Sequence, residues 1–253
     1  MSVHSDFGKL MRESENLLAP LVSIDDPSVS EVLASVHPDF LIVDMEHSVV
    51  DLPALQRISM AAKPLNVIAR IRGGEKNEIK KVLDTGVAGI IVPGIETVEE
   101  ARNVVSYAKL APAGVRGAGP GRASGYGYGF AEYVKTANDS LVIIQIETKK
   151  AYEKVDEILS VDGLDGYFIG PVDLSMALQL KFSWDNEEFT HAVDRIIEAE
   201  KGRKMIKGIY SPLANPDFTP IIKRHFNFLM FGTDREAITL KYGETIKRFR
   251  GNP

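Results

Sequence analysis

The chain has 253 residues, which is enough for one large domain or two small ones. Hydrophobic residues make up 44% of it and the net charge is −5, so it has neither the apolar excess of a membrane protein nor the basic excess of a nucleic-acid-binding protein. It contains no cysteine, which excludes disulfides and thiolate metal sites. Residues 1–12 lack the pattern of a signal peptide, and no apolar run approaches the roughly 20 residues of a membrane span. We therefore expect a cytoplasmic protein that binds neither membrane nor nucleic acid.

Short apolar runs alternate with helical patterns along the chain. The first helix is expected to begin at Asp26 and Pro27, a capping residue followed by a proline suited to the first turn. The predicted strands cover residues 18–23, 40–44, 66–71, 88–92, 141–146, 166–169, 205–210 and 228–231. The further helices are predicted over residues 51–63, 75–84, 97–110, 130–137, 149–159, 172–180, 186–201, 215–224 and 234–250.

This alternation predicts an α/β fold with a parallel sheet. Eight strand–helix units in about 250 residues match the size of a single (β/α)₈ TIM barrel that spans residues 1–253. A doubly wound open sheet is the alternative. Residues 111–130 interrupt the pattern with many glycines, two prolines and three aromatic residues, and we interpret them as a long ordered loop. Arg116, Arg122, Tyr126 and Tyr128 of this loop are expected to contact either an acidic substrate or a neighbouring subunit.

Two carboxylates follow apolar strands. Glu147 comes directly after the strand at 141–146, and Asp173 comes shortly after the strand at 166–169. In a barrel both emerge at the carboxyl end of the sheet, where barrel enzymes keep their active sites. Each could instead cap the helix that follows it. Together they predict a site for a hard divalent cation, Mg²⁺ or Mn²⁺, because their ligands are oxygen atoms only.

Other strand ends add a base and a cation to the same rim. His47 follows Asp44 and Glu46 after the second strand, and Asp44 is expected to fix the tautomer of His47 and raise its basicity. Arg70 ends the third strand, where a partly buried guanidinium could bind a carboxylated substrate or stabilise negative charge. No lysine ends a predicted strand, which counts against Schiff-base chemistry.

Several short strings of the sequence resemble one known family. They are residues 42–47 (Ile-Val-Asp-Met-Glu-His), 79–86 (Ile-Lys-Lys-Val-Leu-Asp-Thr-Gly), 92–93 (Val-Pro), 112–117 (Pro-Ala-Gly-Val-Arg-Gly), 145–148 (Gln-Ile-Glu-Thr) and 170–175 (Gly-Pro-Val-Asp-Leu-Ser). In this order they are similar to the metal-dependent (class II) pyruvate aldolases, typified by 4-hydroxy-2-oxoheptanedioate aldolase, also called 2,4-dihydroxyhept-2-ene-1,7-dioate aldolase. The resemblance runs from about residue 40 to the final helix.

The resemblance implies a (β/α)₈ barrel and a homo-oligomer, a hexamer built from dimers that exchange their last helix. It implies that Glu147 and Asp173 hold the metal, with Mg²⁺, Mn²⁺ and Co²⁺ all open. It assigns pyruvate binding to Gln145 and to the backbone at Val172 and Asp173, enolate stabilisation to Arg70, and the role of base to His47. It also gives Asp84 the role of raising the basicity of His47, although our own prediction puts Asp84 at the far end of a helix.

The implied reaction is reversible cleavage of a 4-hydroxy-2-oxo acid to pyruvate and an aldehyde through a metal-stabilised enolate. Arg72, where family members often have proline, and the loop at residues 119–129 depart from the family pattern, so the acceptor aldehyde is left open. Two alternatives also stay open. One is a CoA-thioester lyase or an oxo-acid decarboxylase that uses the same metal enolate, and the other is a non-catalytic barrel.

Overall fold

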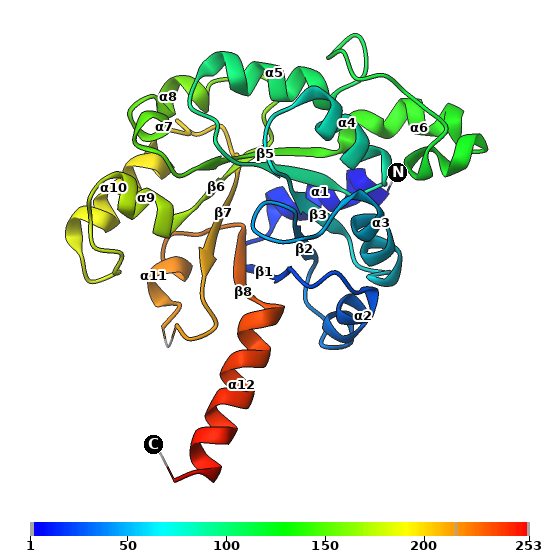
Figure 1. Ribbon diagram of the computed structural model, residues 1–253. Coiled ribbons are helices and arrows are strands. Elements are labelled where there is room, and N and C mark those ends of the chain that lie inside the picture. The colour runs from blue at the N-terminus through cyan, green and yellow to red at the C-terminus, as the bar shows by residue number, and fades with distance from the viewer. Residues whose placement is uncertain (1–2, 216, 252–253) are drawn as a thin grey trace.

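The eight strands form one closed parallel barrel in sequence order (Figure 1). A computed structural model describes residues 3–215 and 217–251 of the chain. The closed barrel confirms the predicted (β/α)₈ fold and excludes the open sheet. The strands are β1 (Leu17–Val22), β2 (Leu41–Asp44), β3 (Val67–Arg70), β4 (Gly89–Val92), β5 (Leu141–Ile146), β6 (Gly166–Ile169), β7 (Ile206–Ser211) and β8 (Phe228–Thr233).

Each strand is followed by at least one helix, as predicted, and one further helix precedes the first strand; most of these helices surround the barrel. They are α1 (Val3–Glu13), α2 (Pro27–Ser35), α3 (Leu52–Ala61), α4 (Lys76–Asp84), α5 (Val98–Ala108), α6 (Phe130–Thr136), α7 (Lys149–Glu153), α8 (Val155–Ile158), α9 (Pro171–Ala177), α10 (Glu187–Glu198), α11 (Thr219–Ile222) and α12 (Asp234–Phe249), with the 3₁₀ segments η1 (Arg122–Gly127) and η2 (Ala137–Asp139).

The helix boundaries have local chemical causes. Asp26 accepts a hydrogen bond from the amide of Ser28 at 2.8 Å, and the proline at the start of α2 needs no donor there. Thr97 and Glu100 form a reciprocal capping box at the start of α5. Gly86, with φ +81°, leaves the helical conformation two residues after α4 ends.

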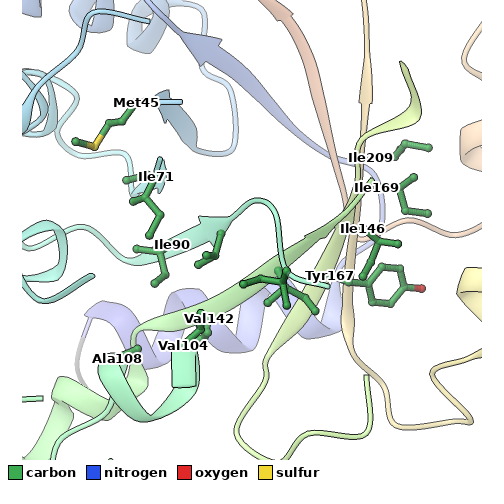
Figure 2. Close-up of a cluster of buried hydrophobic side chains, with 14 of the residues drawn as sticks. Met45, Ile71, Ile90, Val104, Ala108, Val142, Ile146, Tyr167, Ile169 and Ile209 are labelled. Carbon is green, nitrogen blue, oxygen red and sulfur yellow. The ribbon is translucent and has the colours of Figure 1, made fainter. Parts of the chain in front are cut away.

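Strand alternation divides the core into two layers. Inside the barrel lie Ile42, Ile68, Ile143 and Phe168, together with Phe228. Their neighbours along each strand point outward and pack under the helices. Figure 2 shows part of that outer layer, with Val142 of β5 beside Val104 and Ala108 of α5, and Ile146, Tyr167, Ile169 and Ile209 from β5 to β7.

Three elements differ from the predictions. The helix α1 is not among the predicted elements; its Phe7 and Met11, one helical turn apart, pack into the inner core. The helix predicted over residues 149–159 is broken into α7 and α8 at Lys154, whose ψ of 14° is not helical. The helix predicted over residues 215–224 is only α11, and Pro216 lies outside the described residues.

The last helix leaves the barrel. In Figure 1 α12 (red) projects away from the other elements, and Asp234 is its buried residue. Its exposed apolar side chains are Ile238, Leu240, Tyr242, Ile246 and Phe249. Within the part of the chain that the structure describes, no helix is long and apolar enough to cross a membrane.

Candidate active site

The predicted catalytic strand ends converge at one end of the barrel. Asp44, Arg70 and Gln145 each lie two positions after a residue of the inner core, so the period of two directs their side chains inward as well. Strand register places Asp44 directly beside Arg70. The three side chains therefore line the carboxyl-terminal mouth of the barrel, as the sequence predicts.

Arg70 is held by two acids. Its Nε and Nη2 donate to the two carboxylate oxygens of Asp44 at 3.0 and 2.9 Å, and Nε lies 3.3 Å from Oε2 of Glu46. The Arg70 side chain is only 11% exposed. Burial opposes its charge, but the hydrogen bonds and charges of Asp44 and Glu46 raise the pKa of Arg70 above its ordinary value. A fixed positive charge therefore stands at the barrel mouth.

His47 differs from expectation in its acidic partner. The Asp44 carboxylate accepts the backbone amides of Glu46 and His47 at 3.0 and 3.3 Å and pairs with Arg70, so it does not orient the imidazole. The carboxylate beside the ring belongs to Glu46, with Oε1 3.6 Å from Nε2 of His47. Burial raises the pKa of Glu46, against the opposing charges of Arg70 and His47. The His47 side chain is 65% exposed and therefore open to water and substrate.

Glu147 and Asp173 follow neighbouring strands. Glu147 accepts the amide of Gly94 at 3.0 Å through Oε1 and a hydrogen bond from Gln145 through Oε2. A Cβ on Gly170 would lie 3.3 Å from Oε2 of Glu147, so the turn into α9 packs directly against this carboxylate. Asp173 is exposed in the first turn of α9, three residues later.

The donor set fits a hard divalent cation. Two carboxylates lie on adjacent strand–helix turns, and Oε1 of Gln145 is buried without a hydrogen-bond partner. The described residues include no cluster of three or more His, Asp or Glu side chains able to hold a metal ion. A cation here would accordingly be held by two carboxylates together with water and substrate oxygens, which is the usual arrangement for Mg²⁺.

Two cavities open at this rim. One of about 310 Å³ is lined by Asp44, His47, Arg70, Gln145 and Asp173, and one of about 500 Å³, which Glu147 lines, lies beside it over the starts of α4 and α5. We regard the smaller cavity as the active site because His47 and Arg70 line it, whereas the larger one touches the site only through Glu46 and Glu147. The smaller cavity is lined by Leu21, Ser23, Asp44, His47, Arg70, Gln145, Phe168, Gly170, Pro171, Val172, Asp173, Tyr210, Thr233 and Arg235, with no lysine among these described residues.

Asp84 is not part of this site within one chain. It ends α4, which runs from the barrel mouth back to the amino-terminal ends of the strands. There it pairs with Arg116 at 2.9 Å, and the Arg116 side chain is only 1% exposed. This placement agrees with the prediction made from the helix pattern and not with a role beside His47 of the same chain.

Two arginines of the long loop, Arg116 and Arg122, contact other residues of the same chain. Arg116 lies over the ring of Tyr133, 5.9 Å from its centroid, and Arg122 donates to the carbonyl of Thr85 at 2.5 Å. Both guanidinium groups thus have partners within the chain, and the expectation that they contact a substrate or a neighbouring subunit stays a prediction. Tyr126 and Tyr128 are exposed, so the expectation for them stays open.

Four polar residues of the cavity wall were not predicted as site residues. Ser23 and Tyr210 lie at the ends of strands, and Thr233 and Arg235 flank the start of α12. Position at a strand end is the signal that could have found them, but a serine or tyrosine there is common, and only closure of the barrel brings β7, β8 and β1 together.

Comparison with known proteins identifies the family of this chain. The chain matches the HpcH/HpaI aldolase/citrate lyase family over residues 21–238. It is 31% identical over 252 residues to the hydroxypyruvate/pyruvate aldolase of Roseovarius nubinhibens, covering 96% of both chains. It is 37% identical over 175 residues to the 4-hydroxy-2-oxovalerate aldolase of Novosphingobium aromaticivorans, covering 68% of this chain and 66% of that one.

Solved structures share the fold. The HpcH/HpaI aldolase of Desulfitobacterium hafniense DCB-2 superposes with a TM-score of 0.87 at 24% identity, covering 100% of this chain and 98% of that one. The citrate lyase beta subunit of M. tuberculosis, complexed with oxaloacetate and magnesium, gives 0.59 at 15% identity over 89% of this chain and 95% of that one. The matched family and the aldolase relatives show that this chain belongs to the HpcH/HpaI aldolase/citrate lyase family and is an enzyme of the aldolase type.

Proposed function

We propose that this enzyme reversibly cleaves a 4-hydroxy-2-oxo acid to pyruvate and an aldehyde, with a divalent cation as cofactor. The observation that carries the proposal is the fixed Arg70–Asp44 pair beside His47 in the cavity that also contains Gln145 and Asp173. These groups supply a positive charge, a base and carbonyl-binding donors within one cavity, which is what carbon–carbon cleavage next to a keto group requires.

Glu147 and Asp173 would hold the cation, and Mg²⁺ or Mn²⁺ suits two carboxylates better than a softer metal. When bound, such an ion acts as a Lewis acid on the keto oxygen. Gln145 and the backbone at Val172 and Asp173 would bind the oxo acid next to it. The amide groups in the first turn of α9 are free to donate to a carboxylate, because the first amides of a helix have no partner within it.

His47 would take the proton of the C4 hydroxyl, directly or through a water molecule. The C3–C4 bond then breaks, the C4 oxygen becomes the aldehyde carbonyl, and the electron pair of the broken bond forms the pyruvate enolate. Arg70 would stabilise that negative charge. At an effective dielectric constant near 20, two unit charges about 4 Å apart interact by roughly 4 kcal/mol. Protonation of C3 then gives pyruvate.

Replacing Glu147 with alanine tests the proposal. We expect Glu147→Ala to bind Mn²⁺ more weakly in calorimetry and to lose metal-dependent formation of pyruvate. Glu153→Ala is the matched control, since Glu153 is exposed on α7 and pairs with Lys149 one turn away. Full metal-dependent activity in Glu147→Ala would end the proposal.

We also propose a homo-oligomer in which α12 packs on another subunit, in line with the hexamer that the sequence resemblance implies. The support is the set of apolar side chains that α12 leaves exposed beyond the barrel. Ile246→Glu should reduce the mass measured by light scattering, whereas Thr245→Glu, at a neighbouring polar position, should leave it unchanged. Equal masses for both variants would contradict a role of α12 in assembly.

A further inference from the structure

The active-site cavity has a wall that the proposed reaction does not use. The reactive groups come from β2, β3, β5 and the start of α9, but the cavity continues over β7, β8 and β1. On that side it is lined by Ser23, Tyr210, Thr233 and Arg235. A substrate held as an oxo acid at Gln145 and Asp173 would direct its aldehyde-derived part toward this wall.

Arg235 is the cation of the wall. It lies in the first turn of α12, and its Nη2 donates to the carbonyl of Ser23 at 2.7 Å. That contact fixes the guanidinium beside the cavity, since Ser23 also lines it. An arginine has five N–H donors, so most of them stay available. Among the residues that the structure describes, Arg235 forms no salt bridge with a carboxylate.

The acids closest to Arg235 in sequence already have partners. Asp234 accepts the amides of Ser23 and Ile24 at 2.8 and 2.9 Å, the Ser23 hydroxyl at 2.5 Å and the amide of Arg235 at 2.8 Å. Glu236 lies 3.4 Å from both the Tyr210 hydroxyl and the amide of Ala214. Neither carboxylate forms a salt bridge with the Arg235 guanidinium in the described part of the chain.

The other charged side chains of the cavity have a partner or an assigned role. Arg70 is already paired with Asp44 and assigned to the enolate, and Asp173 is assigned to the cation. Tyr210 adds no negative charge near neutral pH, because burial and the neighbouring Glu236 raise its pKa to about 12. Arg235 is therefore the charged side chain that lines this wall, and it offers a planar fork of donors of the kind that binds a carboxylate through two parallel hydrogen bonds.

We propose that Arg235 binds a carboxylate on the aldehyde half of the substrate, so that the preferred acceptor is a short aldehyde acid rather than a neutral aldehyde. This inference rests on the proposed aldolase function and adds a specificity residue to it. The cavity of about 310 Å³ lies at the lower end of the volumes that hold small ligands, which limits the acceptor to a few carbon atoms.

The test compares acidic and neutral acceptors in the intact, Mn²⁺-loaded enzyme. Glyoxylate and succinic semialdehyde are the acidic probes, and glycolaldehyde and propionaldehyde are the neutral ones. The wild-type enzyme should show the higher kcat/KM with the acidic probes. In Arg235→Gln that value should fall about tenfold or more for the acids and stay within twofold for the neutral aldehydes, because one charge-assisted hydrogen-bonded pair is lost.

Two further variants separate charge from structure. Arg235→Lys keeps the charge but not the planar fork, and should retain part of the preference for acids. Arg102→Gln removes a positive charge from the exposed face of α5, away from the cavity, and should change nothing. If Arg235→Gln lowered kcat/KM equally for acidic and neutral aldehydes, its role would be structural and the inference would be overturned.

A second experiment tests the proposed function separately from this inference. It uses NMR to measure the exchange of the pyruvate methyl protons with solvent when no aldehyde is present. Arg235→Gln should exchange these protons with the same KM for pyruvate as the wild type. A raised KM would mean that Arg235 binds pyruvate itself, which overturns the inference. If the wild-type enzyme exchanges the pyruvate protons but prefers neutral aldehydes, the inference alone is overturned. If the wild-type enzyme does not exchange these protons, the proposed function is overturned and the inference with it.

Discussion

Arg70 and Asp44 form a bidentate salt bridge across neighbouring strands, with Nε and Nη2 of the guanidinium 3.0 and 2.9 Å from the two carboxylate oxygens. The register of β2 and β3 sets them opposite each other, and the period of two turns both into the barrel. Asp44 also accepts the amides of Glu46 and His47. One carboxylate thus fixes the guanidinium and the turn that carries the proposed base, so the positive charge is in place before substrate arrives.

Replacing Arg70 with lysine should lower kcat/KM for aldol cleavage by about 10²- to 10³-fold, the cost typical of losing one preorganised donor to a developing oxyanion. Lysine keeps the charge but cannot donate in parallel to both oxygens of Asp44. Steady-state kinetics and pyruvate proton exchange should fall together, because both pass through the enolate. Arg57→Lys, at an exposed arginine paired with Asp25, is the control. Activity near that of the wild type in Arg70→Lys would contradict the assigned role.

The sequence predicts the barrel and its reactive rim because both depend on local patterns. Apolar runs of four to six residues ending in Asp44, Arg70 and Glu147 show which residues are strands and which side chains reach the mouth. Since every strand of a parallel barrel ends at the same rim, the expected grouping of Asp44, Arg70 and Gln145 needs no knowledge of distances, and in the structure the three residues line one cavity.

Partner choice within the site was not predictable in this way. The order Asp44, Glu46, His47 in the sequence does not show which of the two acids contacts the imidazole. Both carboxylate oxygens of Asp44 accept hydrogen bonds from Arg70, and Glu46 is therefore the acid beside His47. Arg235 is likewise hidden in the sequence. It appears as an ordinary charged residue in a first helical turn until β8 and β1 meet and place it against Ser23.

Glu46 should make stability depend on pH. Burial raises its pKa above the ordinary value of 4.5, so the folded state binds the proton more tightly than the unfolded state does. The stability that this proton contributes is complete below pH 4.5 and is lost as the pH rises through the raised pKa. In urea denaturation of chelator-treated protein, the wild type should therefore lose stability relative to Glu46→Gln as the pH increases from 4.5 to 7. Glu153→Gln, at an exposed position, should run parallel to the wild type.

Replacing Asp84 with asparagine should destabilise the fold. The change leaves the Arg116 guanidinium, whose side chain is 1% exposed, without its carboxylate partner. Breaking a buried pair costs about 3–5 kcal/mol, and since Asp84 is itself 27% exposed we expect the lower end of that range in urea denaturation. Glu132→Gln, which breaks an exposed pair with Lys135, should cost less than about 1 kcal/mol.

The pH–rate profile of the same Asp84 variant gives a second readout. Within one chain Asp84 lies at the opposite end of the barrel from His47, so an unchanged profile in the folded variant is the expected result. A shift in the pKa of the proposed base would instead show that Asp84 acts on His47 of another subunit, which would reconcile this structure with the role that the sequence resemblance gives Asp84.

Adding a side chain at Gly208, inside the barrel, should destabilise the fold. A Cβ there would lie 2.1 Å from Cζ of Phe228, the register partner of Gly208 on β8, and that ring stacks on Phe168 at 5.9 Å. Overpacking of this kind typically costs 1–3 kcal/mol. Gly208→Ala should therefore unfold at a lower urea concentration than the wild type, whereas Gly243→Ala, with nothing near the added carbon in an exposed part of α12, should be neutral or stabilising.

Phe168 forms part of the active-site cavity, so displacement of the two rings should also raise KM for the oxo acid. Unchanged stability and KM in Gly208→Ala would show that the rings can move aside without cost, which contradicts the close packing described for the barrel interior.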